Sequence, residues 1–272
     1  MRFLAFLLLF GQSLWALPAD SLHVTYIANE GFLLDDGHQA VAVDAFFTHG
    51  LNTFDAPPPA VLAQMRTATG PFARLRYMLV THTHRDHFDA ALVAAHMAAN
   101  PLCQLILPHQ GVAALQKQPG YAAWASRVTA IGGKFGDVES PIAASSLGLT
   151  AMMLKHGPYM KEGINKHADV QNCAYLLQLG GKTILHLGDA TVDWNRHLFP
   201  VEPLKERPVD LLFLQYYDIA EASAQWIQSQ IQPDQVIGMH LRLGHRERQE
   251  RFMAAVYPGA LFFRTPMMKK VF

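Results

Sequence analysis

The sequence has little charge, and it lacks any low-complexity segment that could separate domains. Only 16% of its 272 residues are charged and half are hydrophobic, which is typical of folded globular proteins. The 22 basic and 22 acidic residues leave no formal net charge. Because phosphate binding favours a basic face, this balance argues against a nucleic acid as the main partner. A chain of this length often folds as one domain.

Cysteine is scarce, with only Cys103 and Cys173 present. Each lies in an apolar, strand-like run, and neither has a Cys or His neighbour at the spacing of a ligand pair. The two positions therefore argue against a thiolate metal site. An oxidising compartment would permit a disulfide, but two buried free thiols are the favoured interpretation.

Long apolar runs are missing except at the N-terminus. Arg2 precedes an apolar run over residues 3–10, and small or polar residues follow at Gly11 and Ser13 before Ala16. This layout is typical of a secretory signal peptide. The run is shorter than the ~20 residues that span a bilayer, so an uncleaved anchor is the less favoured alternative. We expect residues 1–16 to be removed on export and residues 17–272 to act in the periplasm or outside the cell, without a membrane span.

Short apolar runs alternate with helical patterns along the rest of the chain. Strands are expected over residues 23–28, 31–36, 40–46, 76–81, 103–107, 127–131, 147–155, 172–179, 182–189, 209–215, 235–240 and 260–263. Helices are expected before Gly70, from the N-cap Asp89 to about Asn100, and over residues 109–118, 220–230 and 247–256. Tight turns are expected at Asp36-Gly37 and Gly180-Gly181. This alternation predicts an α/β fold in which two sheets pack together with helices outside.

Histidine is abundant, with 14 residues, and it is concentrated in the segment THTHRDH at residues 81–87. His82 and His84 alternate in an extended stretch, so their side chains point to the same side and one ion can take both imidazoles. Asp86 and His87 follow where the strand turns into a helix, and they can reach a second ion. Imidazole and carboxylate ligands suit zinc, manganese or iron.

The sequence resembles the metallo-β-lactamase superfamily. Members carry His-x-His-x-Asp-His, then a lone His after a strand, an Asp in a Gly-Asp pair and a last His at a strand end. The later residues are present here as His156 after LTAMMLK, Asp189 in HLGDA and His240 at the end of QVIGMH. The resemblance covers nearly all of residues 17–272, and it implies an αββα sandwich of two mixed sheets flanked by helices.

The resemblance also implies two divalent ions, with zinc expected and manganese or iron as alternatives. One ion would be held by His82, His84 and His156, the other by Asp86, His87 and His240, and both by the bridging Asp189. The expected nucleophile is a hydroxide between the ions, so no Ser or Cys nucleophile is needed. Asp86 is the candidate catalytic residue, because it could orient that hydroxide or accept its proton.

Other polar residues have two interpretations each. Residues 29–32 (Asn-Glu-Gly-Phe) resemble the start of the subgroup that includes ascorbate-phosphate lactonase, but we interpret them mainly as a turn in which Gly31 permits a positive φ. Asp44 is either a partner of a ligand histidine or part of a surface turn. His186 is more often a packed core residue than a ligand. The loop with Lys161, Lys166 and His167 could contact an anionic substrate, but a solvated loop is the more common case.

The expected function is that of an exported metallo-hydrolase acting on a small ester, lactone or phosphoester. The loop after His156 lacks the Thr-x-Gly-His continuation of glyoxalase-II-like and classical β-lactamase members, and the hairpin over residues 172–189 is similar to the lactonase-related subgroup. No flavodoxin-like extension and no domain between Asp189 and His240 are present, which argues against the di-iron oxygen-reducing and RNA-cleaving branches. The alternatives are a β-lactamase and a metal-binding accessory protein without turnover. The sequence leaves the oligomeric state open.

Overall fold

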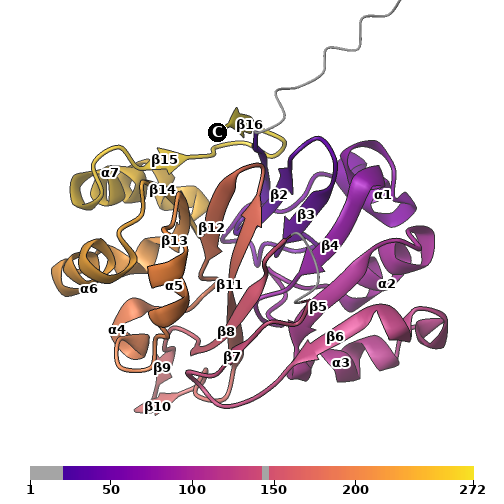
Figure 1. Cartoon of the computed structure of the whole chain (residues 1–272), viewed down its shortest axis with the longest axis horizontal. Coiled ribbons are helices and arrows are strands. Elements are labelled where there is room, and N and C mark those ends of the chain that lie inside the picture. Colours follow the sequence, from indigo (N-terminus) through magenta and orange to yellow (C-terminus); the bar gives the residue numbers. More distant parts are fainter. Residues whose placement is uncertain (1–20, 143–146) are drawn as a thin grey trace, which may run out of the picture.

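The computed structural model describes residues 21–142 and 147–272. The expected signal peptide over residues 1–16 lies outside these described residues. Two seven-stranded sheets pack face to face, and helices cover both outer faces (Figure 1). The predicted αββα sandwich with two mixed sheets is therefore confirmed. No helix within the described residues is long and apolar enough to cross a membrane.

The first sheet has the strand order β16-β1-β2-β3-β4-β5-β6. Its strands are β1 (His23–Ala28), β2 (Gly31–Asp35), β3 (Ala40–Val43), β4 (Leu75–Leu79), β5 (Gln104–Pro108), β6 (Val128–Ile131) and β16 (Lys269–Val271). Strands β3 to β6 are parallel, and parallel neighbours need long crossover connections. These are supplied by α1 (Pro59–Thr67), α2 (Ala90–Ala99) and α3 (His109–Gln116), which cover the outer face of the sheet (Figure 1).

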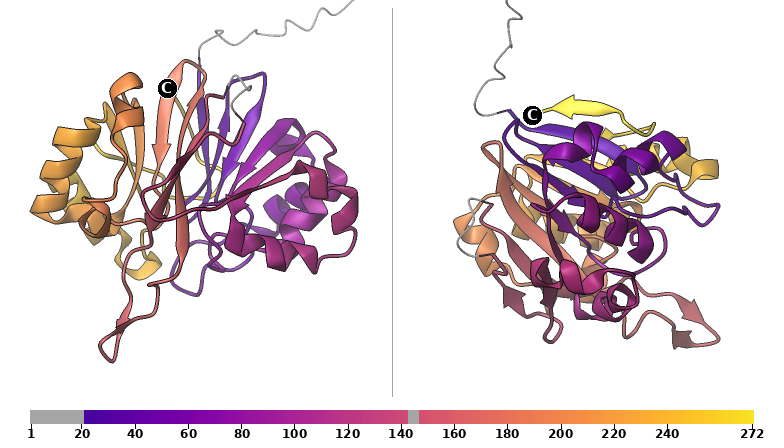
Figure 2. Two further views of the ribbon diagram at one scale, coloured as in Figure 1. Left: turned by 60° about the horizontal axis from the view of Figure 1, so that its bottom comes forward. Right: turned by 90° about the vertical axis from the view of Figure 1, so that its right-hand side faces the viewer.

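The second sheet has the order β15-β14-β13-β12-β11-β8-β7. Its strands are β7 (Val138–Glu139), β8 (Thr150–Lys155), β11 (Gln171–Leu179), β12 (Lys182–His186), β13 (Leu211–Gln215), β14 (Gln235–Met239) and β15 (Leu261–Phe262). Its outer face carries α4 (Val192–Asn195), α5 (Glu202–Glu206), α6 (Glu221–Trp226) and α7 (Arg246–Val256). A separate hairpin of β9 (Met160–Lys161) and β10 (Ile164–Asn165) projects from the body in both views of Figure 2.

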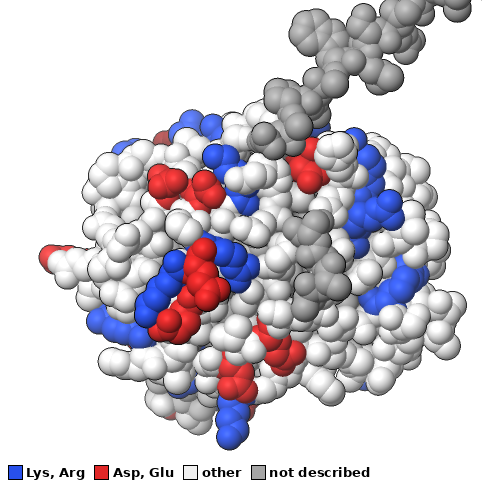
Figure 3. All heavy atoms as spheres, viewed as in Figure 1, with Lys and Arg blue, Asp and Glu red and all other residues white. Residues whose placement is uncertain are grey.

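Short helical turns complete the described chain. They are η1 (Gly70–Arg74), η2 (Tyr121–Ala123), η3 (Ala125–Arg127), η4 (Tyr216–Ile219), the π-helical η5 (Ile227–Ile231) and η6 (Leu243–His245). On the face shown in Figure 3, basic and acidic side chains of the described residues are interspersed.

The core has three layers, one between the sheets and one beneath each set of helices. Strand β13 shows how one sequence serves two of them: Leu211 and Phe213 face the other sheet, whereas Leu212 and Leu214 face the helices. A strand buried on both faces needs a continuous apolar run, which is why this segment lacks alternation. Cys103 and Cys173 are buried in different layers as free thiols, as expected.

Most expected elements are present, with their ends shifted by a few residues. Asp89 caps α2, since its Oδ1 accepts hydrogen bonds from the N–H groups of Ala91 and Leu92. The two predicted turns are confirmed by positive φ values of 87° at Gly37 and of 56° and 70° at Gly180 and Gly181.

The differences from expectation have local causes. The strand expected to reach Phe46 ends at Val43, because the chain turns at Asp44 with a φ of 46°. The helix expected over residues 220–230 gives way to a π turn after Trp226. Strand β16 was not predicted: its three residues, Lys269 to Val271, include two lysines and no apolar alternation, and its pairing with β1 is a contact between chain ends.

Candidate metal centre

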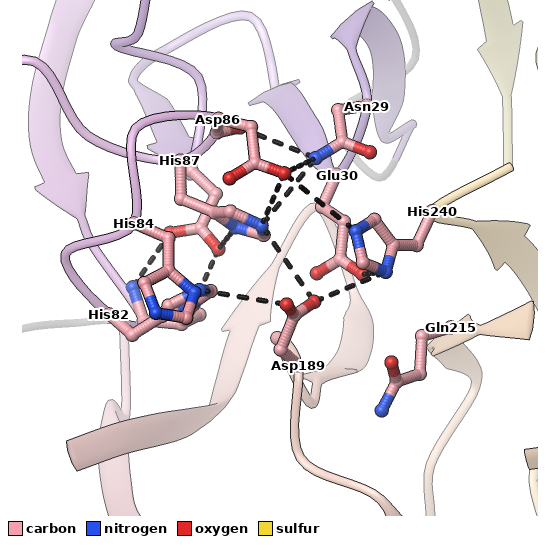
Figure 4. Close-up of polar contacts among 12 residues, drawn as sticks. Asn29, Glu30, His82, His84, Asp86, His87, Asp189, Gln215 and His240 are labelled. Atoms are coloured by element: carbon pink, nitrogen blue, oxygen red, sulfur yellow. Dashed lines mark hydrogen bonds and ion pairs between the residues drawn. The ribbon is translucent and has the colours of Figure 1, made fainter. Parts of the chain in front are cut away.

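All seven predicted ligands come together after the carboxyl ends of strands from both sheets. Figure 4 labels each of them except His156. The segment with His82, His84, Asp86 and His87 follows β4. The other three residues follow strands of the second sheet: His156 follows β8, Asp189 follows β12 and His240 follows β14. Strand ends of this kind hold side chains rigidly while leaving them open to a ligand.

A first cluster consists of three imidazoles and one carboxylate. Nδ1 of His84 lies 3.1 Å from Nε2 of His82 and 3.1 Å from Nε2 of His156. Oδ2 of Asp189 lies 3.0 Å from Nε2 of His156 and 3.6 Å from Nε2 of His82. A tetrahedral ion with bonds of ~2.0–2.1 Å has ligand atoms about 3.3 Å apart, so the four atoms fit a divalent ion such as zinc.

A second cluster lies beside the first. Oδ2 of Asp86 is 3.8 Å from Nε2 of His87 and 3.8 Å from Nε2 of His240. The other oxygen of Asp189, Oδ1, is 3.7 Å from Nε2 of His87 and 3.4 Å from Nδ1 of His240. The carboxylate of Asp189 therefore faces both clusters, which is the position predicted for a bridging ligand.

Several atoms of the second cluster have no partner of their own. Oδ1 of Asp189 and both ring nitrogens of His240 are buried, and no group in the described part of the chain forms a hydrogen bond with them. Buried polar atoms are nearly always paired, because leaving them unpaired costs free energy. A cation bound to Oδ1 of Asp189 and to one ring nitrogen of His240 would satisfy both of these atoms, so the residues present fit the metal ion that the sequence predicts.

Burial and charge set the protonation of the cluster. Burial lowers the pKa of His82 well below its usual value, and it lowers the pKa of His84 to about 4. Both rings are therefore neutral near pH 7, which is the form that binds metal. Burial opposes ionisation of Asp189 as well, but His240, His87 and His156 outweigh it and hold the pKa of this carboxyl well below its usual value.

Asp44 orients one of the candidate ligands. Its Oδ2 lies 2.9 Å from Nδ1 of His87, and its oxygens also accept hydrogen bonds from the backbone N–H and the hydroxyl of Thr81. Burial alone would lower the pKa of His87, but Asp189, Asp44 and Asp86 raise it to about 9. Asp44 is 1% exposed, so of its two interpretations the surface turn is wrong.

Three residues of the site adopt a left-handed backbone conformation that only glycine adopts freely. The φ values are 48° at Asn29, 46° at Asp44 and 57° at His240. Such residues cost of order 1–3 kcal/mol each, and they persist where the surrounding structure enforces them, often at functional sites. Here all three lie against the candidate ligands or belong to them.

Residues 29 and 30 form a turn, as expected, but Gly31 is not the residue that makes the turn possible. The expectation also missed the contacts that Asn29 and Glu30 make with the site. Asn29, and not Gly31, takes the positive φ; a Cβ at Gly31 would lie 2.8 Å from the carbonyl oxygen of Asp44. Nδ2 of Asn29 donates to the carbonyl and to Oδ2 of Asp86, at 3.3 Å each. Glu30 is fully buried beside His240 (Figure 4). The sequence feature that could have identified Asn29 and Glu30 is that two polar residues stand between two apolar runs, each of which forms a buried strand.

The loop that carries Asp189 is held by residues that no motif identified. Asn172 accepts a hydrogen bond from the N–H of Asp189 and donates one to the carbonyl of Leu187. Nε2 of Gln215 donates to the carbonyl of Ala190. His186 is buried, and its Nδ1 accepts a hydrogen bond from the N–H of Gly188. The prediction of His186 as a packed core residue is confirmed, and this residue supports the same loop.

A cavity of about 470 Å³ opens beside the two clusters. His156, Asp189 and His240 form part of its lining, together with the outer residues Tyr159, His167, Trp194, Tyr217 and Arg242. The guanidinium of Arg242 donates a 3.0 Å hydrogen bond to the hydroxyl of Tyr217.

Of the three loop residues considered as substrate contacts, only His167 reaches this cavity. Its Nδ1 lies 3.0 Å from Nδ1 of His156. Lys161 and Lys166 are exposed and lie outside the described lining. The sequence did not single out Arg242, the basic residue of this lining, because it has no pattern of its own.

Comparison with known proteins agrees with this geometry. A family model described as "Beta-lactamase superfamily domain" matches residues 40–251. A "UPF0173 metal-dependent hydrolase" of Heliobacterium modesticaldum is 31% identical over 228 residues, which cover 80% of this chain and 82% of the relative.

Solved structures share the fold at much lower identity. The metallo-beta-lactamase fold protein YhfI of Bacillus subtilis superimposes with a TM-score of 0.58 at 16% identity, over 93% of this chain and 99% of YhfI. The short form of human tRNase Z superimposes with a TM-score of 0.56 at 11% identity, over 91% of this chain and 98% of tRNase Z. Likeness at this level concerns the fold alone, since one fold hosts many reactions.

Proposed function

The chain belongs to the beta-lactamase superfamily of metal-dependent hydrolases, and we propose that it hydrolyses a small ester or lactone with two divalent ions at the centre described above. The observation that carries the proposal is the placement of Asp189, whose two oxygens face two separate groups of candidate ligands. A carboxylate shared in this way offsets part of the charge of two dications held close together.

Each candidate ligand has a place in this proposal. The first ion would be held by His82, His84 and His156, the second by Asp86, His87 and His240, and both by Asp189. Zinc is the expected metal, with manganese or iron as alternatives. When bound, the ions would supply a hydroxide nucleophile near neutral pH and polarise the substrate oxygen. Asp86, oriented by Asn29, would then hold the proton released at the nucleophile.

The cavity indicates the kind of substrate. Its volume of about 470 Å³ suits a small molecule, and Trp194 and Tyr217 supply apolar walls. Arg242 at its rim can bind an acidic group through charge-assisted hydrogen bonds. We therefore propose a small ester or lactone that carries a carboxylate or phosphate group, with phosphoesters as the second choice.

Export remains part of the proposal. The signal-peptide layout over residues 1–16 supports a mature protein that starts near Leu17 and acts in the periplasm or outside the cell. Fractionation of expressing cells, followed by N-terminal sequencing, tests this. Unprocessed protein found only in the cytoplasm would contradict it.

One activity screen tests the reaction itself. Metal-loaded protein is assayed against lactones, carboxylic esters, phosphodiesters and β-lactams, with the metal-free protein as control. We expect lactone or ester hydrolysis that depends on metal and exceeds β-lactam hydrolysis. Rapid β-lactam hydrolysis without lactone hydrolysis would replace the substrate assignment, and turnover of none of them would favour a binding protein.

A further inference from the structure

Glu30 is a buried carboxyl group that has no hydrogen-bond partner among the described residues. It is 0% exposed, and neither of its oxygens forms a hydrogen bond with any group in the described part of the chain. Burial and the neighbouring carboxylates of Asp189, Asp44 and Asp86 raise the pKa of Glu30 well above its usual value. Buried polar groups are nearly always paired, because leaving them unpaired costs free energy, so this buried carboxyl needs a physical explanation.

The position of Glu30 is fixed by its backbone. It lies in the turn between β1 and β2, and its carbonyl oxygen is 3.0 Å from Nε2 of His186. The next residue, Gly31, packs so closely on the carbonyl of Asp44 that no Cβ fits there. The turn is therefore held against the inner side of the site, and the side chain points into the site rather than into solvent.

The carboxylate is aimed at the second cluster. Oε1 of Glu30 lies 3.7 Å from Nδ1 of His240. A carboxylate oxygen of Glu30, one of Asp189 and a ring nitrogen of His87 all lie within 4.8 Å of one another. In Figure 4, Glu30 lies beside His240, next to Asp189. Buried polar atoms without a hydrogen-bond partner therefore lie close together here: both carboxyl oxygens of Glu30, Oδ1 of Asp189 and the ring nitrogens of His240.

We propose that Glu30 is an eighth residue of the metal centre, a carboxylate ligand of the second ion alongside His87 and Asp189. This inference rests on the proposed two-ion centre, and it adds a ligand that the His-x-His-x-Asp-His pattern does not contain. An additional oxygen ligand makes the second position richer in carboxylate than the first, which has three imidazoles. Oxygen-rich sites suit manganese or iron more than zinc, so the second position would accept Mn²⁺ readily.

The test compares Mn²⁺ binding by the mature protein, Glu30→Gln and the control Glu206→Gln, in which an exposed carboxylate on α5 is neutralised. Glutamine keeps the shape and an oxygen that can accept a hydrogen bond from His240, but it loses the charge of a ligand. Mn²⁺ titration followed by electron paramagnetic resonance should give two ions for the mature protein and for Glu206→Gln. For Glu30→Gln we expect the second ion to bind at least ~10-fold more weakly.

The unfolding temperature of the metal-free proteins controls for folding. Because Glu30→Gln replaces a buried carboxyl that has no hydrogen-bond partner by a neutral side chain of the same shape, the metal-free variant should be at least as stable as the metal-free parent protein. A lower unfolding temperature would contradict the inference, and so would second-ion affinity within twofold of that of the mature protein. If the mature protein binds two ions and Glu30→Gln binds both equally well, only the role of Glu30 fails. If the mature protein itself binds fewer than two ions, the proposed centre fails.

Discussion

Oδ2 of Asp44 lies 2.9 Å from Nδ1 of His87, and this contact determines which ring nitrogen of His87 faces the site. Nε2 is left to face Asp86 and Asp189, at 3.8 Å and 3.7 Å. Carboxylates that hold a ligand histidine in this way fix its tautomer and raise its basicity. Asp44 directly follows β3, so the contact joins the end of that strand to the turn between β4 and α2.

Replacing Asp44 by Asn should weaken the binding of the second ion. The amide keeps the shape but loses the charge that raises the basicity of His87, so we expect metal affinity at that position to fall ~10–100-fold. Competition with a chromophoric chelator measures the affinity. Asp234→Asn is the matched control, because Asp234 is exposed at the start of β14, at the other end of the strand from His240. Equal affinities in the two variants would show that Asp44 does not act on the centre.

Gly188→Ala should damage both stability and metal binding. A Cβ at Gly188 would lie 2.5 Å from Oγ1 of Thr81 and 2.7 Å from Oδ1 of Asn172, so the loop that carries Asp189 would have to shift. We expect about 1–3 kcal/mol of destabilisation in urea unfolding and a reduced metal content. Gly120→Ala separates this clash from backbone strain, since Gly120 also has a positive φ but no atom within 4 Å of its Cβ. Similar losses in both variants would rule out the clash as the cause.

Asp218 should make the stability of the metal-free protein depend on pH. Burial raises the pKa of this carboxyl from 3.8 to about 7, so between these values the folded state holds a proton that the unfolded state has lost. The contribution of Asp218 to the free energy of unfolding therefore falls as the pH rises through this range. In Asp218→Asn this fall should be absent, a difference of about 2 kcal/mol between pH 5 and pH 7. Denaturant unfolding curves measure it, and parallel pH profiles for the two proteins would contradict the assignment.

Arg242, rather than the lysines of the β9–β10 hairpin region, should select acidic substrates. Removing its guanidinium in Arg242→Met should raise KM for an acidic ester roughly 10-fold or more above the effect on a neutral analogue, because a charge-assisted hydrogen bond is lost. The control is the double variant Lys161→Ala, Lys166→Ala, which removes exposed charges outside the described lining. We expect its effect on the two esters to be equal. If the preference for the acidic ester is lost in the lysine variant and kept in Arg242→Met, the lysines and not Arg242 select acidic substrates.

The sequence predicts the fold, and it singles out seven residues that the structure brings together, because both depend on local patterns. The segment around His82 is contiguous, and Asp189 and His240 each follow an apolar strand that can be identified from composition alone. Side chains that act across the fold have no such pattern. Glu30 meets His240 only when the two sheets pack, and Asn172 supports Asp189 only once β11 and β12 pair.

The same limit explains the errors in the fold. Strand β16 is defined by its pairing with β1, between residues such as His23 and Val271 at opposite ends of the chain. Lys161 and Lys166 follow His156 closely in sequence, and this closeness suggested a role at the site. The hairpin of β9 and β10 instead carries that stretch of chain away from the body (Figure 2). Arg242, which follows β14, lines the cavity.

The central claim is that Asp189 joins two ion positions in one centre. Elemental analysis of carefully reconstituted protein tests it most directly, with the double variant His84→Ala, Asp189→Ala as the reference. We predict about two divalent ions per chain for the unsubstituted protein, and a larger loss in Asp189→Ala than in His156→Ala, because among the seven candidate ligands only Asp189 faces both clusters. Unsubstituted protein that holds no more metal than the double variant would contradict the account.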